Sequence, residues 1–183
     1  MKKIIKELLD TSIYLLVVLV LTYLVITFVG QRTEVSGSSM ETTLSHGDNL
    51  IVDKLSYCFH EPERFDIIVF PFQYQEDTYY IKRIIGMPGE TVRIDEEGTI
   101  YIGDEDGVRV LEESYGMETI QFPGRAYEEV ELGEDEYFVL GDNRNNSTDS
   151  RMPEVGNIHR SDIIGRAWVR IWPFDKFGVL KHQ

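Results

Sequence analysis

The hydropathy pattern begins with one long apolar segment near the N-terminus. Residues 13–29 carry no charge and, with their neutral flanks, form a run of about 20 residues, the length of α-helix that crosses roughly 30 Å of bilayer hydrocarbon. We expect a cytoplasmic N-terminus over residues 1–10 and a transmembrane anchor over residues 11–30. A cleaved secretory signal is the alternative, but the run exceeds the usual apolar core of about 7–15 residues and ends without a small-x-small cleavage site.

The charges that flank this segment predict its orientation. Lys2, Lys3 and Lys6 precede it, whereas Arg32 is the single cation just after it. Cytoplasmic flanks carry the excess of lysine and arginine in membrane proteins. We therefore expect a single-pass chain in the cell membrane whose body, residues 31–183, is extracytoplasmic.

Beyond the anchor, short apolar or alternating runs are separated by Gly, Pro, Asp and Asn clusters, a pattern typical of β-strands and turns. No amphipathic helix of usual length is predicted after Gly30. The runs predict a mostly β fold, an antiparallel β-sandwich or partly open barrel, in one domain. Residues 95–118 are acidic and glycine-rich, and we expect them to form a surface excursion rather than core. The predicted strands are 49–55, 65–70, 78–85, 91–94, 99–102, 126–132, 136–140 and 163–172.

Composition narrows the range of partners and cofactors. The formal net charge is −14, and such a surface repels phosphate backbones, so we expect no nucleic-acid partner. Cys58 is the single cysteine and supplies neither an internal disulfide nor a zinc cluster. The four histidines are scattered along the chain. We therefore expect no metal and no organic cofactor.

A candidate nucleophile lies directly after the predicted anchor. Residues 35–44 are rich in hydroxyls and contain Gly37, and Ser39 is the serine that we single out. A flexible polar linker has the same composition. The assignment of Ser39 therefore depends on a base elsewhere in the chain.

Lys82 is the candidate base. It lies in the predicted strand 78–85, where period-two alternation places apolar side chains on both faces. Burial in such a setting lowers the pKa of a lysine from about 10.4 and lets the neutral amine accept a proton. Serine attack needs a base of this kind within hydrogen-bond reach, so Ser39 and Lys82 form a plausible dyad. The alternative is a surface lysine that snorkels at a strand end.

A third polar segment, residues 141–151, follows the predicted strand 136–140. It contains almost no apolar side chain and could be a long solvated turn. Its hydroxyls are nevertheless able to orient an amine, and Asp149 and Arg151 are spaced to pair with each other and hold the loop still.

Together these three segments resemble the type I signal peptidase (leader peptidase) family. The family's nucleophile segment, Ser-Met-x-Pro-Thr-Leu, is similar to residues 39–44, and its base segment resembles residues 80–90. Its late segment, Gly-Asp-Asn-Arg-x-Asn-Ser-x-Asp-Ser-Arg, matches residues 141–151. The resemblance covers essentially the whole chain, and the order and combination of the segments make it specific.

The resemblance implies a membrane-bound serine endopeptidase that removes signal peptides from secretory preproteins. Cleavage is expected after small residues in an Ala-x-Ala pattern, at the surface of the lipid bilayer. Ser39 would be the nucleophile, Lys82 the general base, and Ser147 the group that orients the lysine. The expected structural supports of the site are Asp142, Arg144, Asp149 and Arg151, and the expected pocket residues are Val35 and Ile81.

Two positions depart from the family pattern or distinguish its branches. Thr42 stands where the family usually has proline, so the loop is expected to be less rigid. Gly37 stands where one branch has an oxyanion-stabilising serine, whereas the typically Gram-positive branch has glycine. An oxyanion hole here would rest on backbone N–H groups, including that of Ser39.

Other functions remain open at this point. A Ser-His-Asp hydrolase could use His46 or another histidine, although no G-x-S-x-G elbow surrounds Ser39. A membrane-tethered β-domain that binds an extracellular partner would need neither Lys82 nor the segment 141–151. An inactive family member is the third alternative, because of Thr42.

Overall fold

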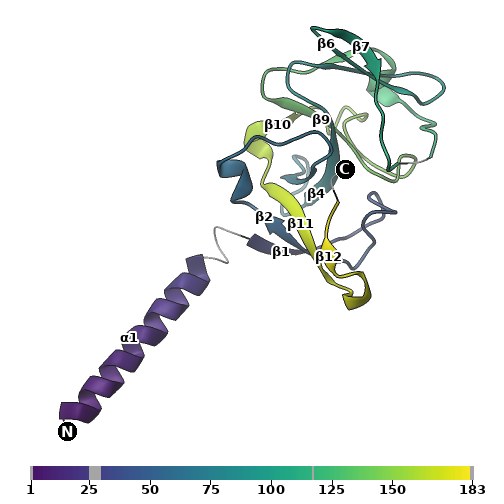
Figure 1. Ribbon diagram of the computed structural model, residues 1–183. Coiled ribbons are helices and arrows are strands. Elements are labelled where there is room, and N and C mark those ends of the chain that lie inside the picture. The colour runs from purple at the N-terminus through teal and green to yellow at the C-terminus, as the bar shows by residue number, and fades with distance from the viewer. Residues whose placement is uncertain (1, 25–29, 117, 182–183) are drawn as a thin grey trace.

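The computed structural model describes residues 2–24, 30–116 and 118–181. Helix α1 (Lys2–Leu24) projects away from the β-rich body (Figure 1), and the apolar side chains along it are exposed. The described residues include no helix that combines the length and the apolar character needed to cross a membrane. The expected N-terminal helix is present as α1, which already begins at Lys2. Of the predicted anchor, residues 11–24 lie in α1, residues 25–29 lie outside the described residues, and Gly30 instead begins strand β1 (Gly30–Glu34).

The body consists of two antiparallel sheets. The larger has the order β1-β2-β11-β3-β4-β9-β10, with β12 beside β11, and the smaller has the order β7-β6-β5-β8. The strands are β1 (Gly30–Glu34), β2 (Asn49–Asp53), β3 (Ile67–Pro71), β4 (Tyr79–Gly86), β5 (Thr91–Ile94), β6 (Ile100–Asp104), β7 (Gly107–Val110), β8 (Val130–Glu131), β9 (Glu136–Leu140), β10 (Ile158–His159), β11 (Gly165–Trp172) and β12 (Gly178–Val179). The short 3-10 helices are η2 (Ser56–Cys58), η3 (Gly124–Tyr127), η4 (Arg160–Asp162) and η5 (Phe174–Lys176).

This architecture confirms the expected mostly β, antiparallel fold but not its barrel form. In the described part of the chain, neither sheet closes on itself, because the larger ends at β1 and β10 and the smaller at β7 and β8. Strands β1, β7, β10 and β12 were not predicted, since they are short or carry few apolar residues.

Strands β4 and β9 join the two sheets through a shared core. Along β9, Tyr137 and Val139 pack into a cluster on one face of the larger sheet. Phe138 and Leu140 point to the opposite face and pack with the apolar side chains of the smaller sheet, as the period of two in a strand requires. Because β4 also contributes to both clusters, this central strand is fixed from two sides.

The expectation that residues 95–118 form a surface excursion is wrong for their first half. Strand β6 lies in this range and buries Ile100 and Ile102 in the core of the smaller sheet. The exposed strand β7 then covers its edge. The strand 99–102 was predicted, but the acidic, glycine-rich residues on either side of it led us to place it at the surface.

Replacement of Ile102 tests whether this segment is part of the core. We expect Ile102→Ala to lower the free energy of unfolding of the full chain by about 2–5 kcal/mol, because it removes buried apolar contacts and leaves a cavity. Val108→Ala, at an exposed position of β7, should change it by less than about 0.5 kcal/mol. Urea unfolding of both variants gives the comparison. If both substitutions change the free energy of unfolding by the same small amount, residues 95–118 form a surface excursion after all.

Candidate active site

The loop that carries Ser39 is anchored by buried apolar side chains on both sides. Val35, Met40 and Leu44 pack into one cluster with residues of β2, β3 and β11, and Leu44 N donates to Met40 O over 2.8 Å. Between these anchors, Gly37 has a φ of 103°, a backbone conformation that suits glycine and strains other residues. The short turn therefore brings Ser39 out of the core and presents its hydroxyl.

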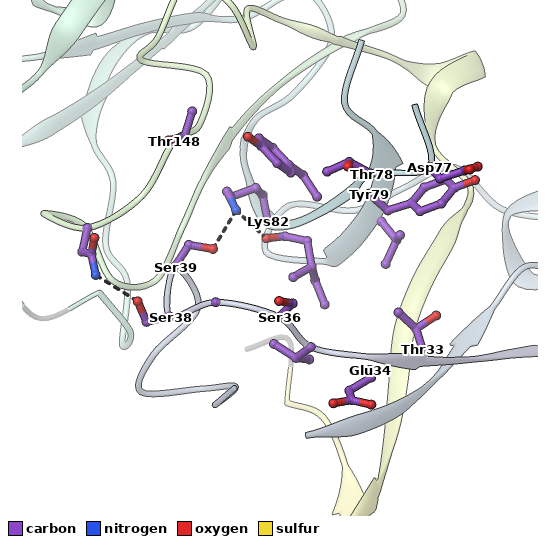
Figure 2. A pocket seen from close by; sticks show the side chains of 16 residues that line it. Thr33, Glu34, Ser36, Ser38, Ser39, Asp77, Thr78, Tyr79, Lys82 and Thr148 are labelled. Carbon is purple, nitrogen blue, oxygen red and sulfur yellow. Dashed lines mark hydrogen bonds between the residues drawn. The ribbon is translucent and has the colours of Figure 1, made fainter. Parts of the chain in front are cut away.

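Lys82 meets Ser39 from the central strand β4. Its Nζ donates to Ser39 Oγ over 2.8 Å and to Ile81 O over 2.9 Å, and Figure 2 shows both contacts. Nζ also lies 5.0 Å from the centre of the Tyr80 ring. The structure thus brings together the predicted nucleophile and the predicted base, which are 43 residues apart in the sequence.

Burial controls the protonation of this lysine. Only 3% of Lys82 is exposed, and loss of hydration lowers its pKa to about 8, against the opposing pull of the Asp149 and Asp142 carboxylates. An amine with a pKa of about 8 is partly neutral near physiological pH. In that state its lone pair can accept the proton of the Ser39 hydroxyl across the same contact.

The segment after β9 holds the Ser39 loop from the other side. Asn143 N donates to Ser39 O over 3.0 Å, and the Asn143 side-chain amide donates to Ser38 O over 3.0 Å. The Asn146 amide reaches Ser38 Oγ at 2.9 Å (Figure 2). Gly141 allows this approach, because a Cβ there would lie 2.4 Å from Ser39 O and 2.2 Å from Ser147 Oγ.

Two buried ion pairs fix the same segment. Arg83 Nε and Nη2 donate to the two oxygens of Asp142 over 2.8 and 2.6 Å. Arg151 makes the equivalent bidentate contact with Asp149, with both distances 2.8 Å, and Asp149 also accepts from Gly141 N. The expected Asp149–Arg151 pair is confirmed. The Arg83–Asp142 pair was not predicted, because its partners are 59 residues apart and nothing in the sequence links them.

Ser147 does not make the hydrogen bond expected of it. Its Oγ is buried and has no hydrogen-bond partner among the residues that the structure describes, whereas Lys82 Nζ is directed to Ser39 and to the carbonyl of Ile81. The close contact of Ser147 with Gly141 still places it at the site.

A cleft of about 570 Å³ opens beside the Ser39–Lys82 pair. Its lining comes from residues 33–39 and residues 77–82, with Val69, Asn146 and Thr148, and Figure 2 shows the two segments on opposite sides of the opening. Both predicted pocket residues, Val35 and Ile81, line this cleft. Between residues 30 and 181, Met117 apart, no three His, Cys, Asp or Glu side chains are grouped as metal ligands.

The chain is similar in sequence to known proteins over most of its length. Residues 7–172 match the family model described as signal peptidase, peptidase S26. "Probable signal peptidase I-2" of Synechocystis is 40% identical over 84% of this chain and 68% of its own length. "Signal peptidase I P" of Bacillus subtilis subsp. natto is 31% identical over 88% of both chains. A crystal structure of a signal peptidase I from Enterococcus faecalis is 33% identical, with a TM-score of 0.47, and covers 58% of this chain and 97% of its own.

The buried pair between Arg83 and Asp142 supplies a test of the site's construction. We expect Asp142→Ala to destabilise the chain by about 3–5 kcal/mol, because it leaves the Arg83 guanidinium buried beside an empty space. The control is Asp175→Ala, which removes an exposed carboxylate. If urea unfolding gives the same small change for both variants, the Asp142 pair does not hold the site.

Proposed function

Because the chain belongs to the signal peptidase family, peptidase S26, we propose that it removes signal peptides from preproteins with Ser39 as the nucleophile and Lys82 as the general base. It is a serine endopeptidase of the signal peptidase I type. The observation that carries the assignment of the dyad is the 2.8 Å contact between Lys82 Nζ and Ser39 Oγ at a cleft.

The proposed reaction has two steps. Neutral Lys82 takes the proton from Ser39 Oγ, which attacks the scissile carbonyl carbon and forms a tetrahedral intermediate. The Lys82 ammonium then gives its proton to the leaving amine, and the C–N bond breaks to leave an acyl-enzyme. Water hydrolyses this ester in the second step, with Lys82 again as the base.

Backbone amides would stabilise the negative charge on the substrate oxygen. We assign the Ser39 N–H to this role, because Gly37 offers no side chain for it. The peptide that follows is held by the hydrogen bond from Asn143 N to Ser39 O. Donors that are fixed before the reaction stabilise the transition state without the cost of reorganisation.

The edge of β4 offers a place for an extended substrate. Strand β9 begins to pair with β4 at Arg83, so the residues from Tyr79 to Lys82 pair only with β3 in the described sheet. Ile84 exchanges hydrogen bonds on the β3 side, and alternation therefore directs the backbone groups of Ile81 to the opposite, open edge. A peptide added there would place alternate side chains near Val35 and Ile81, and a shallow apolar site of this kind fits the small residues of an Ala-x-Ala sequence.

The N-terminal helix is proposed to hold the enzyme at the bilayer. In α1, Ile13, Leu16 and Leu19 are 52%, 61% and 66% exposed, and a helix with an apolar surface of this extent requires apolar surroundings. We assign the anchor to α1 from Thr11 onward, residues 1–10 to the cytoplasm, and the body from Gly30, where β1 begins, to the extracytoplasmic side. Attachment would confine the site to the surface where signal peptides emerge and raise the effective concentration of both partners.

The other functions have weaker support. In the described structure, His46 Nδ1 accepts a hydrogen bond from Gly37 N over 3.3 Å. This contact uses the imidazole to support the loop and does not bring it to Ser39 as a base. A catalytically inactive member is disfavoured because Ser39 and Lys82 meet although Thr42 replaces proline. A tethered binding domain does not require a buried lysine beside a serine hydroxyl, so it does not account for the Ser39–Lys82 contact.

Substitution of either dyad residue tests the proposal. Detergent-solubilised Ser39→Ala and Lys82→Met are expected to lose about 10⁴-fold or more of the cleavage rate on a preprotein with an Ala-x-Ala site, because each removes a group that reacts. Lys176→Met, at an exposed position, is the matched control. Full activity of Lys82→Met with an intact fold would exclude the lysine as the base.

The pH dependence of cleavage gives a second test. Below its pKa, Lys82 is protonated and cannot accept the Ser39 proton, so kcat/KM should rise with pH and level off above about 8. The pH profile should be measured with the full chain over the range where it stays folded. A rising limb near pH 6.5 that disappears when the histidines are replaced would instead identify a histidine base.

A further inference from the structure

Residues 113–116, which follow β7, lie against the two buried arginines that support the site. Glu113 binds Arg144 with two contacts, Nη1 to Oε1 at 2.5 Å and Nη2 to Oε2 at 2.6 Å. Two residues further, the Tyr115 ring lies over the guanidinium of Arg83, with Cζ 3.7 Å from the ring centre. One short segment after the last residue of β7 therefore contacts both cations.

Gly116 brings the backbone against Arg144. It has a φ of +63°, and a Cβ at this position would lie 2.4–2.5 Å from the guanidinium atoms of Arg144. With Glu113 bound through both carboxylate oxygens and the backbone of Gly116 close by, the Arg144 side chain is only 1% exposed. A long cationic side chain loses its choice of rotamers when it is held in this way.

The fixed position of Arg144 restricts the backbone of Ser39 through intervening contacts. Arg144 Nε donates to Gly141 O over 3.1 Å, and Gly141 lies so close to Ser39 O and Ser147 Oγ that a Cβ there would collide with both atoms. Asn143, which directly precedes Arg144 in the sequence, donates its N–H to Ser39 O. A continuous series of contacts thus leads from Glu113 through Arg144 and the start of the 141–151 segment to the backbone of Ser39.

We propose that Glu113 is a positioning residue, which fixes Arg144 and thereby holds Ser39 in the place where it reacts with the substrate and Lys82. Glu113 itself does not line the cleft, so it should affect the rate of the chemical step rather than the binding of the peptide. The inference rests on the proposed function, which identifies Ser39 as the reacting group. The contacts between Glu113, Arg144 and the Ser39 loop are independent of that assignment.

The first test compares Glu113→Gln with Glu112→Gln in the detergent-solubilised full chain. Glu112 is the adjacent, exposed carboxylate and is the matched control. We expect Glu113→Gln to lower kcat by about 10–100-fold at unchanged KM, since a displacement of about 1 Å in reacting groups costs about this much. Wild-type kcat in this variant, or a loss that appears in KM alone, would overturn the proposal.

A second readout does not depend on catalysis. Hydrogen exchange at the Asn143 amide reports the bond to Ser39 O, and we expect it to accelerate by about tenfold or more in Glu113→Gln but not in Glu112→Gln. Gly116→Ala, which pushes a Cβ into the Arg144 guanidinium while it keeps every charge, should have the same effect. Unchanged exchange in both variants would refute the positioning role. If the wild type cleaves no preprotein, the proposed function fails, and the exchange rates still decide the role of Glu113.

Discussion

The amine of Lys82 is buried away from water, next to the hydroxyl of Ser39. The carboxylates of Asp142 and Asp149 favour its charged form, yet the pKa is lowered, because desolvation outweighs their attraction. Each carboxylate is already paired with an arginine, and this limits its pull on the lysine. A cationic partner for each carboxylate is therefore part of what keeps the pKa of Lys82 low, as its proposed role as a base requires.

Three segments that are distant in the sequence converge on that amine. The Ser39 loop is anchored in the cluster beside β2 and β11, Lys82 lies on the central strand β4, and the segment 141–151 follows β9. Because β4 and β9 are packed from both sheets, the lysine and the supporting segment share one rigid base. The segment that follows β7 then adds Glu113 and Tyr115 to the arginines of the candidate site, although neither residue lines the cleft.

The sequence predicted the residues of the site better than the contacts that hold them. Ser39, Lys82 and the Asp149–Arg151 pair could be found because each lies in a short motif. The Arg83–Asp142 and Arg144–Glu113 pairs join positions 59 and 31 residues apart, and a single sequence contains no signal for such a contact. The hydrogen bond between Ser147 and Lys82 was expected from resemblance alone and is not present. Strand β6 was assigned to the surface because its apolar alternation spans only Ile100 and Ile102.

Lys82 is proposed to be a neutral base at the pH where the enzyme works, and its titration can be measured directly. The chain would be labelled with ¹³C at the lysine Cε, and the Lys82 signal would be identified by its loss in Lys82→Met. We expect this signal to titrate with a pKa of about 8, well below the ordinary lysine value of about 10.4. Titration near that ordinary value would rule out Lys82 as the base, because its amine would then be protonated at neutral pH.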